Sequence, residues 1–89
     1  MITGTQIALR AKDHLTLLTG HKPEAVSGLA KEDDGWHVMV DTLELKRIPA
    51  STDIMAAYEL VLDDEGNLVS YGRTRRYSRG QPEEEAIEA

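Results

Sequence analysis

The 89-residue chain contains no cysteine and no phenylalanine, with one tryptophan and three tyrosines. Without cysteine it can form neither disulfides nor thiolate zinc sites, as is usual in a reducing compartment. With so few aromatic residues, we expect a core of Leu, Val, Ile, Ala and Met. The length suits one domain, and a domain this small buries a limited share of its surface. Its stability therefore depends on a well-chosen core.

Long apolar runs are also absent, and basic residues are in the minority. No segment approaches the roughly 18 to 20 apolar residues that span a bilayer. The N-terminus lacks the charged-then-apolar pattern of a secretory signal. Lys and Arg number 10 against 16 Asp and Glu, a net charge of −6. An acidic surface repels nucleic acid and anionic lipid. We therefore expect a cytoplasmic protein with no membrane partner and no general affinity for nucleic acid.

Residues 3–19 predict an amphipathic helix. Small and apolar residues recur there at three- and four-residue spacing and share one face: Gly4, Ile7, Ala8, Ala11, Leu15 and Leu18. Thr3 and Gln6 have the form of a capping box at the start. Gly20 stands where a left-handed cap ends a helix, and Pro23 prevents continuation.

The middle of the chain is typical of strands. Residues 26–32 form a short candidate strand, and Asp-Asp-Gly at 33–35 indicates a tight turn. Residues 36–48 alternate, but the apolar phase shifts near Thr42, which predicts a bulge or strong twist there. Pro49 ends this strand. We expect a loop or short helical turn next, with Ser51 or Thr52 as its cap.

The last part of the ordered chain predicts a hairpin. Its arms are residues 55–62 and 68–77, and 63–67 form the turn. In a regular returning arm, Leu68 and Ser70 share one face. The other face then carries Val69, Tyr71, Arg73, Arg75 and Tyr77.

One helix followed by about four strands with short connections predicts the α+β class. The helix is expected to pack on one face of an antiparallel sheet. Residues 1–80 would form this single domain. Residues 81–89 carry a run of glutamates without a packing pattern, and we predict a disordered acidic tail.

The residues that could carry catalysis or bind a metal are isolated from one another. His14, His21 and His37 fall on a helix, a loop and a strand, without the spacing of a metal pair. The chain has no nucleophile elbow and no phosphate-binding glycine loop. The acidic clusters at 32–34 and 63–65 suit hairpin turns better than a calcium loop. Trp36 is interpreted as a core residue. We expect no catalytic residue, no cofactor and no metal.

An arginine-rich stretch, Tyr71 to Gly80, stands out against this acidic background. Four of the ten basic residues lie here, beside two tyrosines. Arg and Tyr are enriched at interface hot spots, and Arg offers a rigid fork to carboxylates. The predicted partner-binding residues are Tyr71, Arg73, Arg75, Arg76, Tyr77 and Arg79.

Two other interpretations of this stretch stay open. Arginines beside aromatic rings suit single-stranded nucleic acid, through phosphate contacts and base stacking. Alternatively, Glu59, Asp41 or Glu44 pairs with these arginines across neighbouring strands, and no partner is needed.

Residues 33–80 resemble the gas vesicle protein O family, GvpO. The similarity includes Gly35-Trp36 and its alternating valines, and residues 44–68 at several positions. The matching residues there are Glu44, Arg47, Pro49, Asp53, Tyr58, Glu59, Leu62, Asp63, Gly66 and Leu68. It continues through Tyr71, Arg73, Arg75, Arg76, Tyr77 and Arg79, and the helix-to-strand junction extends it to about residue 5. The family's longer charged N-terminal extension is the one part without a counterpart here.

The resemblance implies a non-enzymatic accessory factor for gas vesicle formation. Its expected partners are other gas vesicle proteins, with accessory proteins and the shell subunit both as candidates, and its expected location is the cytoplasm, with gas vesicles. Two alternatives remain: a regulatory nucleic-acid binder, and a small PepSY-like inhibitory or binding domain, which shares the helix-then-meander outline. Pairing of an open sheet edge would also allow a homo-oligomer.

Overall fold

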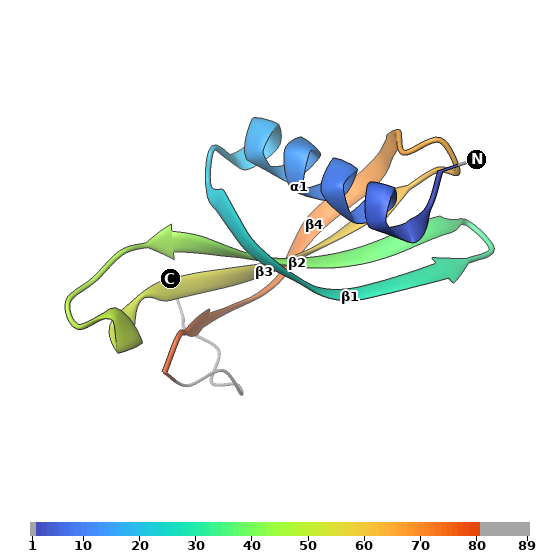
Figure 1. The fold of residues 1–89 in the computed structure, drawn as a ribbon. Coiled ribbons are helices and arrows are strands. Elements are labelled where there is room, and N and C mark those ends of the chain that lie inside the picture. The colour runs from blue at the N-terminus through green and yellow to red at the C-terminus, as the bar shows by residue number, and fades with distance from the viewer. Residues whose placement is uncertain (1, 81–89) are drawn as a thin grey trace.

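The computed structural model describes residues 2–80 (Figure 1). A helix is followed by four strands that form one antiparallel sheet in the order β1-β2-β3-β4. The elements are α1 (Gly4–Thr19), β1 (Lys22–Glu32), β2 (Gly35–Leu45), the 3₁₀ turn η1 (Ala50–Thr52), β3 (Ile54–Leu62) and β4 (Leu68–Ser78). The predicted α+β class, with its N-terminal helix and four antiparallel strands, is confirmed. The tail predicted at 81–89 lies outside the described residues.

Helix α1 is built as its sequence predicts. Thr3 accepts a hydrogen bond from the Gln6 backbone N–H, and the Gln6 side chain accepts one from the Thr3 N–H, so the capping box is present. Gly20 closes the helix in the left-handed conformation, at φ 74°. The side chains of Ile7, Ala11 and Leu15 are fully buried.

The core lies between α1 and the sheet. The helix packs across β1, β2 and β3. The buried core residues are Ile7, Ala11, Leu15, Val38, Val40, Ala56, Tyr58, Leu60 and Leu62. In β2 and β3 these are the even-numbered residues, as the two-residue period of a strand requires. The even-numbered face is called the helix side of the sheet below.

The helix is too short to cover the whole sheet. Its 16 residues span about 24 Å at 1.5 Å per residue, whereas the molecule is 43 Å long. Figure 1 shows β2, β3 and β4 continuing beyond it toward η1. A second, smaller cluster, Met55, Ala57 and Tyr77 with Leu43, forms on the opposite face of the sheet. We call the end of the sheet near η1 the uncovered end.

The bounds of β1 and β2 differ from those predicted. Strand β1 begins at Lys22, ahead of the expected Val26. Pro23 is tolerated because β1 is an edge strand, where a missing N–H leaves no ladder bond unmade. Strand β2 ends at Leu45, and its irregularity lies between Leu43 and Leu45, just after the expected Thr42.

The connection between β2 and β3 contains the expected short helical turn, but its predicted cap is wrong. Pro49 is the N-cap and forms no side-chain cap bond. Ser51 and Thr52 lie inside the turn, where the Thr52 hydroxyl donates to the Pro49 carbonyl at 2.8 Å.

Strand β4 is extended as predicted, but it is not regular. Its pairing with β3 shifts twice, so that Val69 and Thr74 are extra residues without a partner in the register. Each extra residue moves the following side chains to the other face. Tyr71 and Arg73 pair with Leu60 and Tyr58 on the helix side. The predicted single row of tyrosines and arginines is therefore wrong.

Beyond the second shift, Arg75 and Tyr77 pair with Ala57 and Met55, so they lie on the opposite face from Tyr71 and Arg73. Arg76 pairs with Ala56 and returns to the helix side.

Gly35, at the start of β2, packs closely against the end of β3, and this contact can be tested. Its φ is 130°, and a Cβ there would press against the carbonyl oxygen of Leu62. We predict that Gly35→Ala lowers the free energy of unfolding by about 2 to 4 kcal/mol, through backbone strain and overpacking. A Cβ at Gly72 in β4 meets nothing within 4 Å. Gly72→Ala should change stability by less than about 0.5 kcal/mol in urea unfolding. Equal losses would contradict the close approach at Gly35.

Candidate partner-binding surface

Strand β4 forms one edge of the sheet, so its outer backbone groups have no strand beside them. The residues from Val69 to Arg75 are all exposed. Tyr71 is 44% exposed and stacks on the buried Tyr58 ring, with 6.4 Å between centroids. Val69, which the sequence analysis did not select, is 60% exposed. A long exposed edge with an aromatic and an aliphatic side chain is a candidate contact surface.

Glu44 of β2 binds two of the predicted arginines across the sheet. Its carboxylate oxygens lie 3.1 Å from Arg73 Nη1 and 3.0 Å from Arg76 Nε. The Glu44 side chain is only 11% exposed, whereas that of Arg73 is 45% exposed. The partly buried Glu44 carboxylate thus has two guanidinium donors. Together, Glu44, Arg73 and Arg76 carry one net positive charge. The alternative of cross-strand pairing with Glu44 is confirmed for these two arginines.

Arg79 joins three parts of the chain just after β4. Its guanidinium binds both carboxylate oxygens of Glu24 in β1, at 3.0 and 3.1 Å. It also binds Asp53 Oδ2 at 3.1 Å, beside the start of β3. Asp53 is buried and accepts the Arg47 backbone N–H at 2.7 Å. That N–H and the Arg79 guanidinium both lower the pKa of the Asp53 carboxyl. Arg79 therefore links β1 and the start of β3 to the end of β4 at the uncovered end of the sheet.

Arg75 and Tyr77 form a third arrangement on the opposite face. The Arg75 guanidinium carbon lies 4.5 Å from the centroid of the Tyr77 ring, a cation–π contact. Tyr77 is 7% exposed and belongs to the smaller core cluster. Burial raises the pKa of its hydroxyl.

The six predicted partner-binding residues thus differ in what they can contact. Tyr71, Arg73 and Arg75 are exposed, whereas Arg76 and Arg79 are half-buried in ion pairs. Tyr77 is a core residue. Alternation along the strand could not reveal this division, because it depends on the bulge at Thr74. Their role in binding a partner stays a prediction.

His37 forms a separate charged cluster on β2. Its ring nitrogens lie 2.9 Å from Glu59 Oε2 and 2.7 Å from Asp34 Oδ1. The hydrogen bonds to Glu59 and then to Asp34 raise the pKa of His37 to about 9. Glu59, which the sequence offered as a partner for the arginines of β4, pairs with this histidine.

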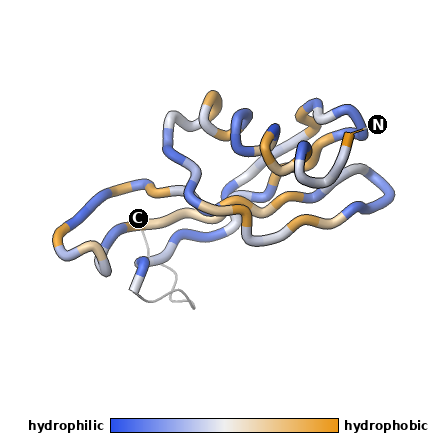
Figure 2. Tube along the Cα trace, viewed as in Figure 1, coloured by the Kyte–Doolittle hydropathy of each residue, from blue (hydrophilic) through white to orange (hydrophobic). Residues whose placement is uncertain are grey.

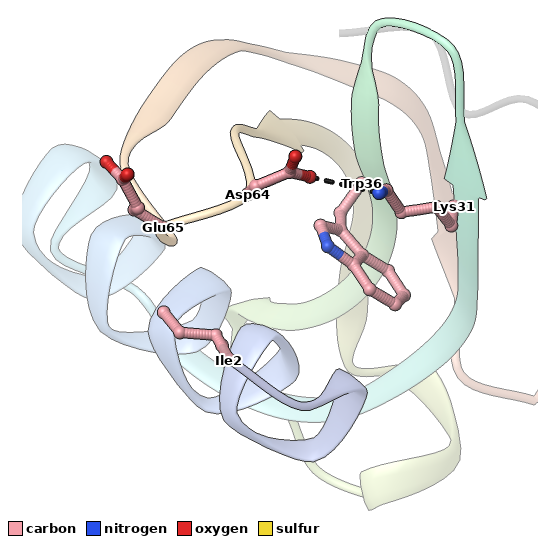
Figure 3. A pocket seen from close by; sticks show the side chains of 5 residues that line it. All are labelled: Ile2, Lys31, Trp36, Asp64 and Glu65. Carbon is pink, nitrogen blue, oxygen red and sulfur yellow. Dashed lines mark ion pairs between the residues drawn. The ribbon is translucent and has the colours of Figure 1, made fainter.

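A pocket lies at the end of the molecule opposite η1, where both hairpin turns meet the start of α1. Its volume is about 390 Å³, and it is lined by Ile2, Lys31, Trp36, Asp64 and Glu65 (Figure 3). Lys31 pairs with Asp64 at 3.1 Å and lies 5.6 Å from the centroid of the Trp36 ring. Trp36 packs against the core, as expected, but it also lines this pocket.

Between residues 2 and 80, no three histidine or acidic side chains lie together in a way that would hold a metal ion. In the same part of the chain, no helix has both the length and the apolar character needed to cross a bilayer.

Comparison with known proteins gives a consistent result. The family model described as "Gas vesicle synthesis protein GvpO" matches residues 1–83. "Gas vesicle protein O" of Streptomyces sp. (strain CB03234) is 45% identical over 67 residues, 75% of this chain and 52% of that protein. "Gas vesicle protein O1" of Halobacterium salinarum is 33% identical over 76 residues, 85% and 64% of the two chains. "Gas vesicle protein O" of Haloferax mediterranei is 32% identical over 78 residues, 86% and 56%.

The chain therefore spans about half to two thirds of the length of these relatives. No solved structure matches it. The resemblance to the gas vesicle protein O family is confirmed.

The His37 cluster gives a pH dependence with a defined sign. Because the pKa of His37 is raised in the folded protein to about 9, its stabilising contribution is full below the unfolded value of about 6.5. That contribution is lost as the pH rises through about 9. We predict that His37→Gln lowers the melting temperature at pH 6, and that its difference from wild type disappears by about pH 10. A difference that stays constant across this range would contradict the protonated cluster.

Proposed function

The chain belongs to the gas vesicle synthesis protein GvpO family, and we propose that it serves gas vesicle formation by binding other gas vesicle proteins. It does so as a non-enzymatic accessory factor, located in the cytoplasm and associated with gas vesicles. The relatives' names support the vesicle role, and the candidate surface on β4 supports binding as the means. The relatives are longer than this chain, and assigning their role to it is part of the proposal.

The observation that carries the proposal is the exposed stretch of β4. Val69 and Tyr71 leave apolar and aromatic surface in solvent on an edge strand. Arg73 and Arg75 lie beside them, on opposite faces of the same strand. A tyrosine with arginines around it is the composition of interface hot spots. We name Val69, Tyr71, Arg73 and Arg75 the β4 surface.

The bulges favour contact through side chains over pairing of strands. Bulges at Val69 and Thr74 twist the edge and leave only a short regular ladder between them. Natural edge strands use such bulges to prevent indiscriminate pairing. The β4 surface would therefore receive a partner mainly through its side chains, with the Tyr71 ring already held against Tyr58.

The charge of the surface indicates a carboxylate-bearing partner. Glu44 with Arg73 and Arg76 keeps a net positive charge. A guanidinium that is already held by an internal carboxylate loses little freedom when a second carboxylate binds it. Accessory gas vesicle proteins and the shell subunit are both candidates for this partner.

Nucleic acid is the weaker alternative. A nucleic-acid backbone needs several accessible basic side chains along its path, but Arg76 and Arg79 are half-buried in ion pairs. The net charge of −6 further reduces long-range attraction to a polyanion.

The test replaces exposed side chains that hold no ion pair. We predict that Val69→Ala with Tyr71→Ala weakens pulldown of the co-expressed gas vesicle partner at least tenfold, and lowers vesicle yield. The matched control is Leu9→Ala with Leu17→Ala, which removes two exposed side chains from the outer surface of α1.

The control pair should retain binding and vesicles, and circular dichroism checks that both double variants are folded. Full vesicle yield from a folded Val69→Ala, Tyr71→Ala protein would exclude the β4 surface as the contact site.

A further inference from the structure

The connection between β2 and β3 exposes aliphatic side chains at the uncovered end of the sheet. Ile48 is 97% exposed, and Leu45 is 49% exposed. Lys46 and Arg47 lie between them and are also exposed. Figure 2 shows hydrophobic colour on this connection, at the left end of the molecule. We name residues 45–48 the tip.

The tip is held in place by its surroundings. The Arg47 backbone N–H donates to Asp53, which is itself bound by Arg79. The turn behind it is closed by bonds from the Asp53 N–H to Ala50 and from the Gly80 N–H to Ser51. A braced segment loses little conformational entropy when it binds, so an exposed isoleucine on it is well suited to anchor an interface. A single exposed aliphatic residue would otherwise need no explanation.

The Trp36 pocket at the opposite end has the complementary character. Ile2 and the indole ring provide apolar surface, and Asp64 and Glu65 provide carboxylates at the edge (Figure 3). An acidic cleft of about 210 Å³ adjoins it, since both share Lys31 and Asp64. Asp33 and Glu32 line that cleft. Lys31 is already paired with Asp64, so the carboxylates that remain dominate the charge there.

The charges of the described chain are divided between its two ends. The two hairpin turns and their flanks carry Glu32, Asp33, Asp34, Asp63, Asp64 and Glu65. Toward the other end, Arg73, Arg76 and Arg79 are already paired with Glu44, Glu24 and Asp53, and Lys46 and Arg47 of the tip add two positive charges. Because β1–β4 form a meander, both hairpin turns lie at one end and the β2–β3 connection lies at the other.

We propose that the tip of one copy of this chain inserts into the Trp36 pocket of a second copy. Ile48 occupies the apolar part of the pocket, whose volume accommodates an aliphatic side chain. Lys46 and Arg47 meet the carboxylates of the pocket edge and the acidic cleft. This contact would bury the exposed Ile48 side chain and bring the positive charges of the tip against the negative charges of the pocket edge.

The arrangement of the two surfaces determines the kind of assembly. Tip and pocket lie at opposite ends of a molecule 43 Å long, so one chain cannot bring its own two surfaces together. The contact is head to tail, and its repetition joins more than two subunits, in a ring or an open chain. The surfaces are small, so we expect weak association that depends on salt and is absent at low protein concentration. This inference does not depend on the β4 surface.

Complementation between two variants tests the proposal. Ile48→Ser removes the anchor of the tip, and Glu32→Lys with Glu65→Lys reverses charge at the pocket. In sedimentation velocity at low salt, wild type is expected to increase in mass with concentration. Each variant alone should associate at least tenfold more weakly. Their mixture should recover association that stops at two chains, because only one intact tip meets one intact pocket.

Two controls keep the outcome interpretable. Leu17→Ser removes another exposed aliphatic side chain, 85% exposed on α1, and should associate like wild type. Amide spectra on dilution should show shifts at both the Ile48 amide and the Trp36 indole N–H of wild type. The proposal is overturned if wild type stays monomeric at about 1 mM, if Ile48→Ser associates like wild type, or if the folded variants show no mixed complex.

Discussion

A mismatch of lengths determines most of this structure: one helix of about 24 Å has to stabilise a sheet in a molecule 43 Å long. At the covered end, α1 buries Leu60, Leu62 and their neighbours. At the uncovered end, ion pairs and the small Met55 cluster take the place of a helix. Glu44 with its two arginines, and Arg79 with Glu24 and Asp53, link β1, β2, β3 and β4 there. The arginines gather on the last strand of an acidic protein because that strand crosses the uncovered end.

This account divides the arginine-rich stretch between stability and binding. Arg76 and Arg79 contribute to the fold, Tyr71 and Arg75 remain accessible on the edge, and Arg73 does both, since it is exposed while paired with Glu44. The same bracing leaves the tip rigid and exposed, since Asp53 holds the Arg47 backbone on one side and Arg79 on the other. The described residues thus carry three surfaces for which we propose contacts: the β4 surface, the tip and the Trp36 pocket.

The sequence predicted those parts of the fold that depend on local pattern. The capping box at Thr3, the left-handed Gly20 and the turn at Asp33 are local signals, and they placed the helix and the turn of the first hairpin correctly. The faces of β4 were predicted wrongly, because bulges at Val69 and Thr74 depend on pairing with β3 and have no signature of their own. Pro23 was interpreted only as preventing continuation of the helix, and the edge position of β1 makes it compatible with a strand. Glu44 was one of several possible partners, and only the three-dimensional structure brings its carboxylate within 3.1 Å of Arg73 and 3.0 Å of Arg76.

Hydrogen exchange of Glu44→Gln tests most directly whether ion pairs hold the uncovered end. With the carboxylate removed, Arg73 and Arg76 lose their shared partner, and the amides of residues 54–57 and 75–78 should exchange at least tenfold faster. Amides of residues 60–62, beneath α1, should keep their protection, and Glu32→Gln on the exposed end of β1 should change neither region. Uniform acceleration across the sheet, or no change near η1, would contradict the account.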